Sequence, residues 1–173
     1  MPLLNPNMTT LHQNIEMSSF LTSTLNEFQR YEALGRKTME QLNDEGLFYR
    51  PNLEVSSVAI LVKHLHGNMM SRWTDFLTTD GEKEWRNREG EFEDTLQSRE
   101  EIYTLWTEGW NLVFETIKAL SEDDLERKVL IRGENHTVYW AINRQLCHYA
   151  YHVGQMVQLG KIILRENWVN LST

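Results

Sequence analysis

The scarcity of proline limits the folds open to this chain of 173 residues more than any other feature. Proline removes a backbone donor and breaks helices, and only three occur here: Pro2, Pro6 and Pro51. Beyond residue 51 no proline interrupts a helix, and apolar residues recur at helical spacing in four long segments. These segments are approximately residues 10–43, 55–77, 98–120 and 138–164. They predict an all-α fold, a four-helix bundle.

Local signals place helix ends and connections. Thr10 with Gln13 has the spacing of a capping box that opens the first helix. A glycine-containing turn separates two short runs, residues 129–131 and 136–138, and predicts a small β-hairpin before the last helix. No linker, repeat or low-complexity segment divides the chain, so residues 1–173 are expected to form one domain.

Composition narrows the function classes. A net charge of −8 argues against non-specific binding to nucleic acid or to anionic membrane surfaces. No apolar run approaches the roughly 18 residues of a membrane span. The single cysteine, Cys147, excludes an internal disulfide framework, and the first residues lack the pattern of a signal peptide. We therefore expect a cytoplasmic protein that acts on a small molecule.

Two histidines on the last predicted helix indicate a metal site. His148 and His152 are four residues apart, which places their Cβ atoms about 5–6 Å apart on one helix face. This spacing lets two imidazoles bind one transition-metal ion. Arg144 and Gln155 lie on the same face, which is too polar for a plain core. The alternative is a pair of histidines with ordinary hydrogen bonds.

A third ligand would come from another helix, and the second predicted helix offers His64 and His66. On a helical wheel His66 projects at the edge of the apolar face, so the wheel nominates it as the buried histidine. His64 lies nearly opposite, on a face of small and polar groups that includes Asn68. Such a face also suits a cleft wall or a subunit contact. The wheel leaves the choice open.

Three segments together carry a family resemblance. They are Lys63–Lys83, with the pattern KHLxGN at its start, Ile131–Glu134, and His148–Gln155, with the pattern HxxxHxGQ. They resemble an uncharacterised, mainly bacillar branch of the DinB/YfiT-like metalloenzyme superfamily, over roughly residues 39–163. The resemblance implies a four-helix bundle with a non-sequential helix order, commonly assembled as a homodimer. It also implies a divalent metal ion, zinc or nickel, bound by His64, His148 and His152. The wheel and the resemblance disagree on the third ligand, and His66, which the wheel nominates, stays the alternative to His64.

The resemblance implies a reaction as well. Three imidazoles with an open fourth position are typical of a catalytic site. Characterised members of the superfamily include thiol-dependent transferases and isomerases that use low-molecular-weight thiols. Transfer of such a thiol to an electrophile is therefore the expected chemistry. Asn68 and Gln155 are candidates for contacts to the ligands or the substrate, and Arg72 or Arg144 for binding a carboxylate of the thiol. Two alternatives remain: a metal-dependent hydrolase, favoured by a carboxylate beside the open position, and a non-enzymatic dimeric stress-response module.

Overall fold

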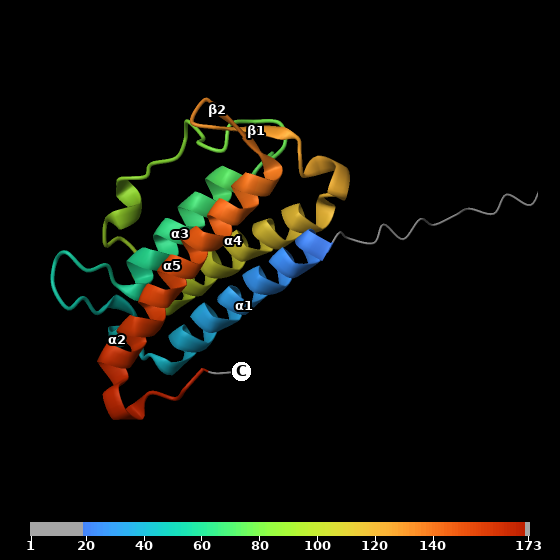
Figure 1. Cartoon of the computed structure of the whole chain (residues 1–173). Coiled ribbons are helices and arrows are strands. Elements are labelled where there is room, and N and C mark those ends of the chain that lie inside the picture. The colour runs from blue at the N-terminus through green and yellow to red at the C-terminus, as the bar shows by residue number, and fades with distance from the viewer. Residues whose placement is uncertain (1–18, 172–173) are drawn as a thin grey trace, which may run out of the picture.

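Four long helices form the body of the protein. The computed structural model describes residues 19–171, so the capping box predicted at Thr10 and Gln13 lies outside the described residues. The helices are α1 (Ser19–Gln41), α3 (Val58–Trp73), α4 (Arg99–Ala119) and α5 (Val138–Leu164) (Figure 1). The prediction of an all-α bundle is confirmed. Among the described helices, none has the length and apolar character that a membrane crossing requires.

The helices do not pack in chain order. Helix α1 packs against α4 and α5, and α3 also packs against α4 and α5. The first two long helices of the chain therefore occupy opposite corners of the bundle, and α5 lies beside α3 (Figure 1). This order brings the helix that carries His64 next to the helix that carries His148 and His152.

Short elements lie between and after the long helices. Between them are α2 (Asp44–Phe48) and two turns of 3-10 helix, η1 (Gly90–Phe92) and η2 (Glu122–Asp124), and a third turn, η3 (Arg165–Asn167), follows α5. The sequence did not predict α2, because Asn43 looks like a helix stop. In the structure the Asn43 side chain accepts a hydrogen bond from the Gly46 amide at 2.8 Å and so caps a new helix. Helix α3 ends at Trp73 rather than near residue 77, since the backbone of Thr74 is extended and Asp75 then adopts a positive φ of 49°.

The predicted hairpin is present at one end of the bundle (Figure 1). Strands β1 (Lys128–Ile131) and β2 (Glu134–Thr137) pair antiparallel, and Gly133 in the turn has a φ of 74°. The Asp80 carboxylate accepts hydrogen bonds from the amides of Arg132, at 2.8 Å, and Gly133, at 2.7 Å. The hairpin is thereby attached to the long connection between α3 and α4.

A buried polar chain fixes α3 against α5. The indole N–H of Trp73 donates to the hydroxyl of Tyr149 at 2.8 Å, and this hydroxyl donates to the Asn68 side chain at 3.1 Å. Burial raises the pKa of Tyr149 well above its ordinary value, so its proton stays available for the second bond. Because Tyr149 adjoins His148, this chain of hydrogen bonds sets the position of the histidines relative to α3.

Candidate metal centre

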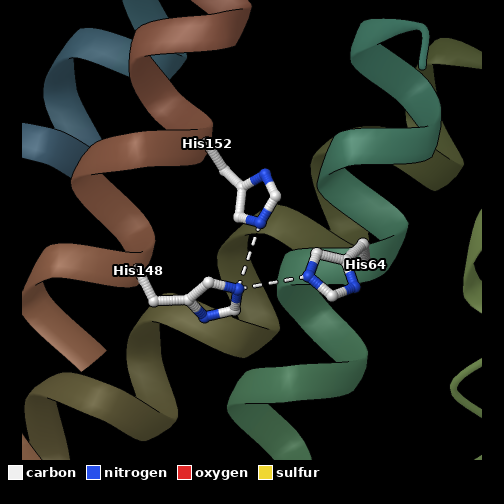
Figure 2. Close-up of side chains that lie close together, drawn as sticks. All are labelled: His64, His148 and His152. Carbon is white, nitrogen blue, oxygen red and sulfur yellow. Dashed lines mark hydrogen bonds between the residues drawn. The ribbon is translucent and has the colours of Figure 1, made fainter. Parts of the chain in front are cut away.

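Three histidines from two helices converge on one point. His64 comes from α3, and His148 and His152 come from successive turns of α5 (Figure 2). The Nε2 atom of His148 lies 3.2 Å from Nε2 of His64 and 3.1 Å from Nε2 of His152. One nitrogen from each ring falls within 4.8 Å of the other two, and the group could hold a metal ion.

The spacing of these nitrogens fits a metal better than it fits hydrogen bonding. Four-coordinate zinc with Zn–N distances near 2.0–2.1 Å separates its ligand nitrogens by about 3.3 Å. A neutral imidazole carries one N–H. The Nδ1 atoms of His64 and His152 face carboxylate and amide oxygens, at 2.9 and 2.8 Å, and donate their hydrogens there. Their Nε2 lone pairs therefore both point toward His148, whose Nε2 can offer a single hydrogen. A cation would pair with all three nitrogens.

The surroundings keep the rings of His148 and His152 neutral, as metal binding requires. Burial lowers the pKa of His148 to about 3, and the neighbouring His152 and His64 add to this shift. Burial also lowers the pKa of His152, against the hydrogen bond to Gln155. At neutral pH His148 and His152 are therefore uncharged and have lone pairs available for a metal.

Glu91 orients His64. Its Oε2 atom accepts the Nδ1–H of His64 at 2.9 Å, and its two oxygens accept a fork of hydrogen bonds from Arg86 at 2.7 and 2.9 Å. Burial alone would raise the pKa of Glu91, but the hydrogen bonds from His64 and Arg86 prevail and lower it. A carboxylate that fixes the tautomer and orientation of a histidine is the usual support of a metal ligand.

The KHLxGN pattern explains how Glu91 reaches its place. The Lys63 ammonium donates to the carbonyl oxygens of Gly90, at 2.6 Å, and of Glu93, at 3.1 Å, and holds the η1 region against α3. A Cβ atom on Gly67 would lie 2.3 Å from Oε1 of Glu91. The pattern therefore combines a histidine with a lysine that anchors the connection and a glycine that leaves room for the carboxylate.

A family comparison covers nearly the whole chain. Residues 16–173 match the model of the DUF1572 family, whose description is "protein of unknown function". The chain belongs to this family. The matched region contains the three histidines of the group and Glu91. Comparison with curated proteins gives no match. The wider DinB/YfiT-like resemblance stays a prediction.

His66 lies away from the three-histidine group. It is half-buried, and its Nε2 lies 3.0 Å from Oε2 of Glu108 on α4. His64 is 3% exposed. The wheel expectation that His66 is the buried histidine is therefore wrong. The polar face that carries His64 is covered by α5 and by the connection that contains Glu91, and a single-helix wheel cannot show either.

The other predicted site residues have different surroundings. Asn68 accepts from Tyr149, and Gln155 accepts from Nδ1 of His152. Arg72 is buried, donates to the Gly81 carbonyl and pairs with Glu82 at 3.0 Å. Arg144 is exposed and lies 5.7 Å from the ring centre of Trp140. Sequence reasoning missed Glu91, although the small residue Gly67 near His64 marks the space that it fills.

A cavity of about 600 Å³ borders the histidines of this DUF1572 protein. Its wall includes His64 and His148, and also Asn68, Arg72 and Arg144, but not Gln155. The described residues that line it include no aspartate or glutamate. The three-histidine group is therefore reached from a space large enough for a small organic molecule, with no acidic side chain in the wall.

Proposed function

We propose that this protein is a metal-dependent enzyme that transfers a low-molecular-weight thiol to an electrophile. His64, His148 and His152 would bind a zinc or nickel ion. The observation that carries the proposal is the convergence of three Nε2 atoms beside a cavity. Three protein ligands leave a fourth position open, which distinguishes a catalytic site from a closed structural one. A metal bound there would lower the pKa of a thiol at that position.

The residues around the site have defined tasks in this proposal. Glu91 and Gln155 hold the Nδ1–H groups of His64 and His152, so that the Nε2 lone pairs face the metal. The stack of Phe92 on the His64 ring, with centroids 4.7 Å apart, covers that ring. In the transfer, the thiol would release its proton to solvent water, the sulfur would bond to the electrophilic atom, and the leaving group would depart from that atom with the electron pair of the broken bond.

Transfer of a thiol is favoured over hydrolysis by the lack of a base. A carboxylate beside the open metal position would favour hydrolysis by assisting proton transfer from water, and none is among the described residues of the cavity wall. Glu91, the acidic residue bonded to His64, is also bonded to Arg86 through both oxygens. A thiol loses its proton far more readily than water does. The DinB/YfiT-like resemblance supports the same choice.

Metal analysis tests the proposal. We expect the protein purified without chelator, or reloaded with zinc or nickel, to contain about one metal ion per chain. His64→Ala and His152→Ala should lose the metal, and His66→Ala, which removes a histidine paired with Glu108 outside the three-histidine group, should keep it. The metal-dependent reaction of a thiol with an activated aryl halide would then be assayed. A wild-type protein that binds no metal after reloading would refute the proposal.

A further inference from the structure

The cavity beside the histidines is strongly basic, although the whole chain has a net charge of −8. Five arginines contribute to its wall: Arg72, Arg86, Arg88, Arg132 and Arg144. No acidic residue is among the described residues that line it. Arginine is the residue best suited to bind carboxylate and phosphate groups, because its planar fork matches their oxygens.

Three of these arginines are already paired from behind the wall. Glu82 accepts from Arg72 at 3.0 Å and from Arg132 at 3.0 Å, and it lies 3.4 Å from Arg86. The Nε and Nη2 groups of Arg86 donate hydrogen bonds to Glu91. Their charges hold the α3–α4 connection and the hairpin together.

Two arginines remain without a counter-charge. Arg88 and Arg144 make no ion pair with any residue in the part of the chain that the structure describes, and both are exposed. Arg144 lies over Trp140, which also lines the cavity. The wall therefore offers two uncompensated positive charges, one of which, Arg144, lies next to an aromatic ring.

Two buried polar atoms in the same wall also lack partners. Arg72 is 7% exposed, and its Nε–H has no acceptor among the described residues. Gln145 is 4% exposed, and its Oε1 has no donor there either. Buried polar groups are nearly always paired, and both side chains border the cavity. Both atoms are themselves covered by the protein, so a ligand would reach them only if neighbouring side chains moved, and the case for an anion site rests on the exposed Arg88 and Arg144.

We propose that this cavity recognises a small substrate through an oxyanion, a carboxylate or a phosphate, bound by Arg88 and Arg144. Anchoring the acid group at the arginines directs the rest of the molecule along the wall toward His64 and His148. This rests on the proposed function in so far as the bound molecule is a substrate, and it deepens that function by naming the substrate class. The binding of the anion itself requires only the arginines.

Calorimetric titration with succinate and with inorganic phosphate tests the anion site. The proteins are the metal-loaded wild type, the double variant Arg88→Gln/Arg144→Gln, and the metal-free His152→Ala. A matched control is Arg30→Gln/Arg127→Gln, which removes the same charge from exposed arginines outside this wall. We expect the first double variant to lose about tenfold or more in affinity for the preferred anion, with unchanged metal content and thermal unfolding. The control should bind as the wild type does.

The variants separate the two proposals. His152→Ala should still bind the anion within about threefold of the wild type, so failure of the metal proposal would leave anion binding intact. Tighter binding of succinate would assign a carboxylate, and tighter binding of phosphate a phosphoryl group. Equal affinity in the wild type and the Arg88/Arg144 variant would overturn the proposal. Loss of anion binding in His152→Ala would also overturn it, because the anion would then contact only the metal. The absence of saturable binding by either anion would overturn it as well.

Discussion

Nδ1 of His64 lies 2.9 Å from Oε2 of Glu91, a residue 27 positions further along the chain. His64 belongs to the regular helix α3, and Glu91 belongs to the turn η1 within a long connection. A segment that looks like a polar loop therefore determines how a buried imidazole is held. Arg86, with a side chain 2% exposed, fixes the carboxylate from its other side.

Glu91→Gln should weaken metal binding by about 10–100-fold, as removal of such supporting groups does in other metal sites. The amide can still accept the hydrogen of His64, but it lacks the charge that makes the imidazole a better ligand and that pairs with Arg86. Competition with a chelator of known affinity measures the change. Glu93→Gln is the control, since that side chain is exposed and only its carbonyl contacts Lys63. Equal affinity of the Glu91 variant and the wild type would contradict this role.

Gly67→Ala should lower both metal affinity and thermal stability. Within a helix, replacement of glycine by alanine ordinarily stabilises a protein by about 0.5–1 kcal/mol. Here the new Cβ would lie 2.3 Å from Oε1 of Glu91 and would displace the carboxylate. Gly154→Ala on α5 is the matched substitution, since no atom lies within 4 Å of its Cβ position. We expect Gly154→Ala to raise the unfolding temperature and Gly67→Ala to lower it. A rise in both would show that Glu91 moves aside without cost.

Tyr149→Phe should destabilise the fold by about 1–3 kcal/mol. It removes the hydroxyl between the Trp73 indole and the Asn68 side chain and leaves two buried polar groups unpaired. Chemical denaturation measures the free energy of unfolding. Tyr151→Phe is the control, because Tyr151 is 63% exposed. Similar values for the two variants would mean that water replaces the lost hydroxyl.

The metal-free protein should lose stability as the pH falls from 7 to 5. Burial lowers the pKa of His148 to about 3, whereas in the unfolded chain it is near 6.5. Between these values the unfolded chain binds a proton that the folded one does not, so acid favours unfolding. The lowered pKa of His152 acts in the same direction. Most carboxylates remain ionised at pH 5, so this interval isolates the histidines.

Thermal unfolding of chelator-treated protein at pH 7 and pH 5 measures this effect. His148→Gln should reduce the drop in unfolding temperature between the two pH values, because one of the proton-binding differences is gone. His66→Gln should keep the wild-type drop, since His66 is only half-buried and lies outside the three-histidine group. An identical drop in all three proteins would refute the assignment.

The sequence predicts the helices well because their signals are local. Nothing interrupts the apolar periodicity of α3, α4 and α5, and a short turn with Gly133 marks the hairpin. The pairing of His148 with His152 is also local, since one helical turn separates them. The short helix α2 escaped prediction because its cap, Asn43, has the appearance of a stop.

The choice of His64 over His66 as the buried histidine depends on tertiary structure. A wheel identifies burial with apolar neighbours, but the face that holds His64 is covered by polar partners from outside α3. Glu91 was missed for the same reason, because its connection has no periodicity to interpret. Only the packing of that connection on α3, through Lys63 and the space at Gly67, shows what the carboxylate does.

Glu82 joins the cavity wall to the support of the histidines. It contacts Arg132 and Arg72 on one side and Arg86 on the other, and Arg86 holds the carboxylate that orients His64. A ligand that draws Arg132 or Arg86 toward itself must therefore alter the hold on His64. Thermodynamic reciprocity then requires that metal occupancy change the affinity for that ligand by the same factor. An anion held by Arg88 and Arg144 alone would bypass this link, because neither arginine pairs with Glu82 in the described part of the chain, so only a ligand that also engages Arg132 or Arg86 would be coupled to the metal.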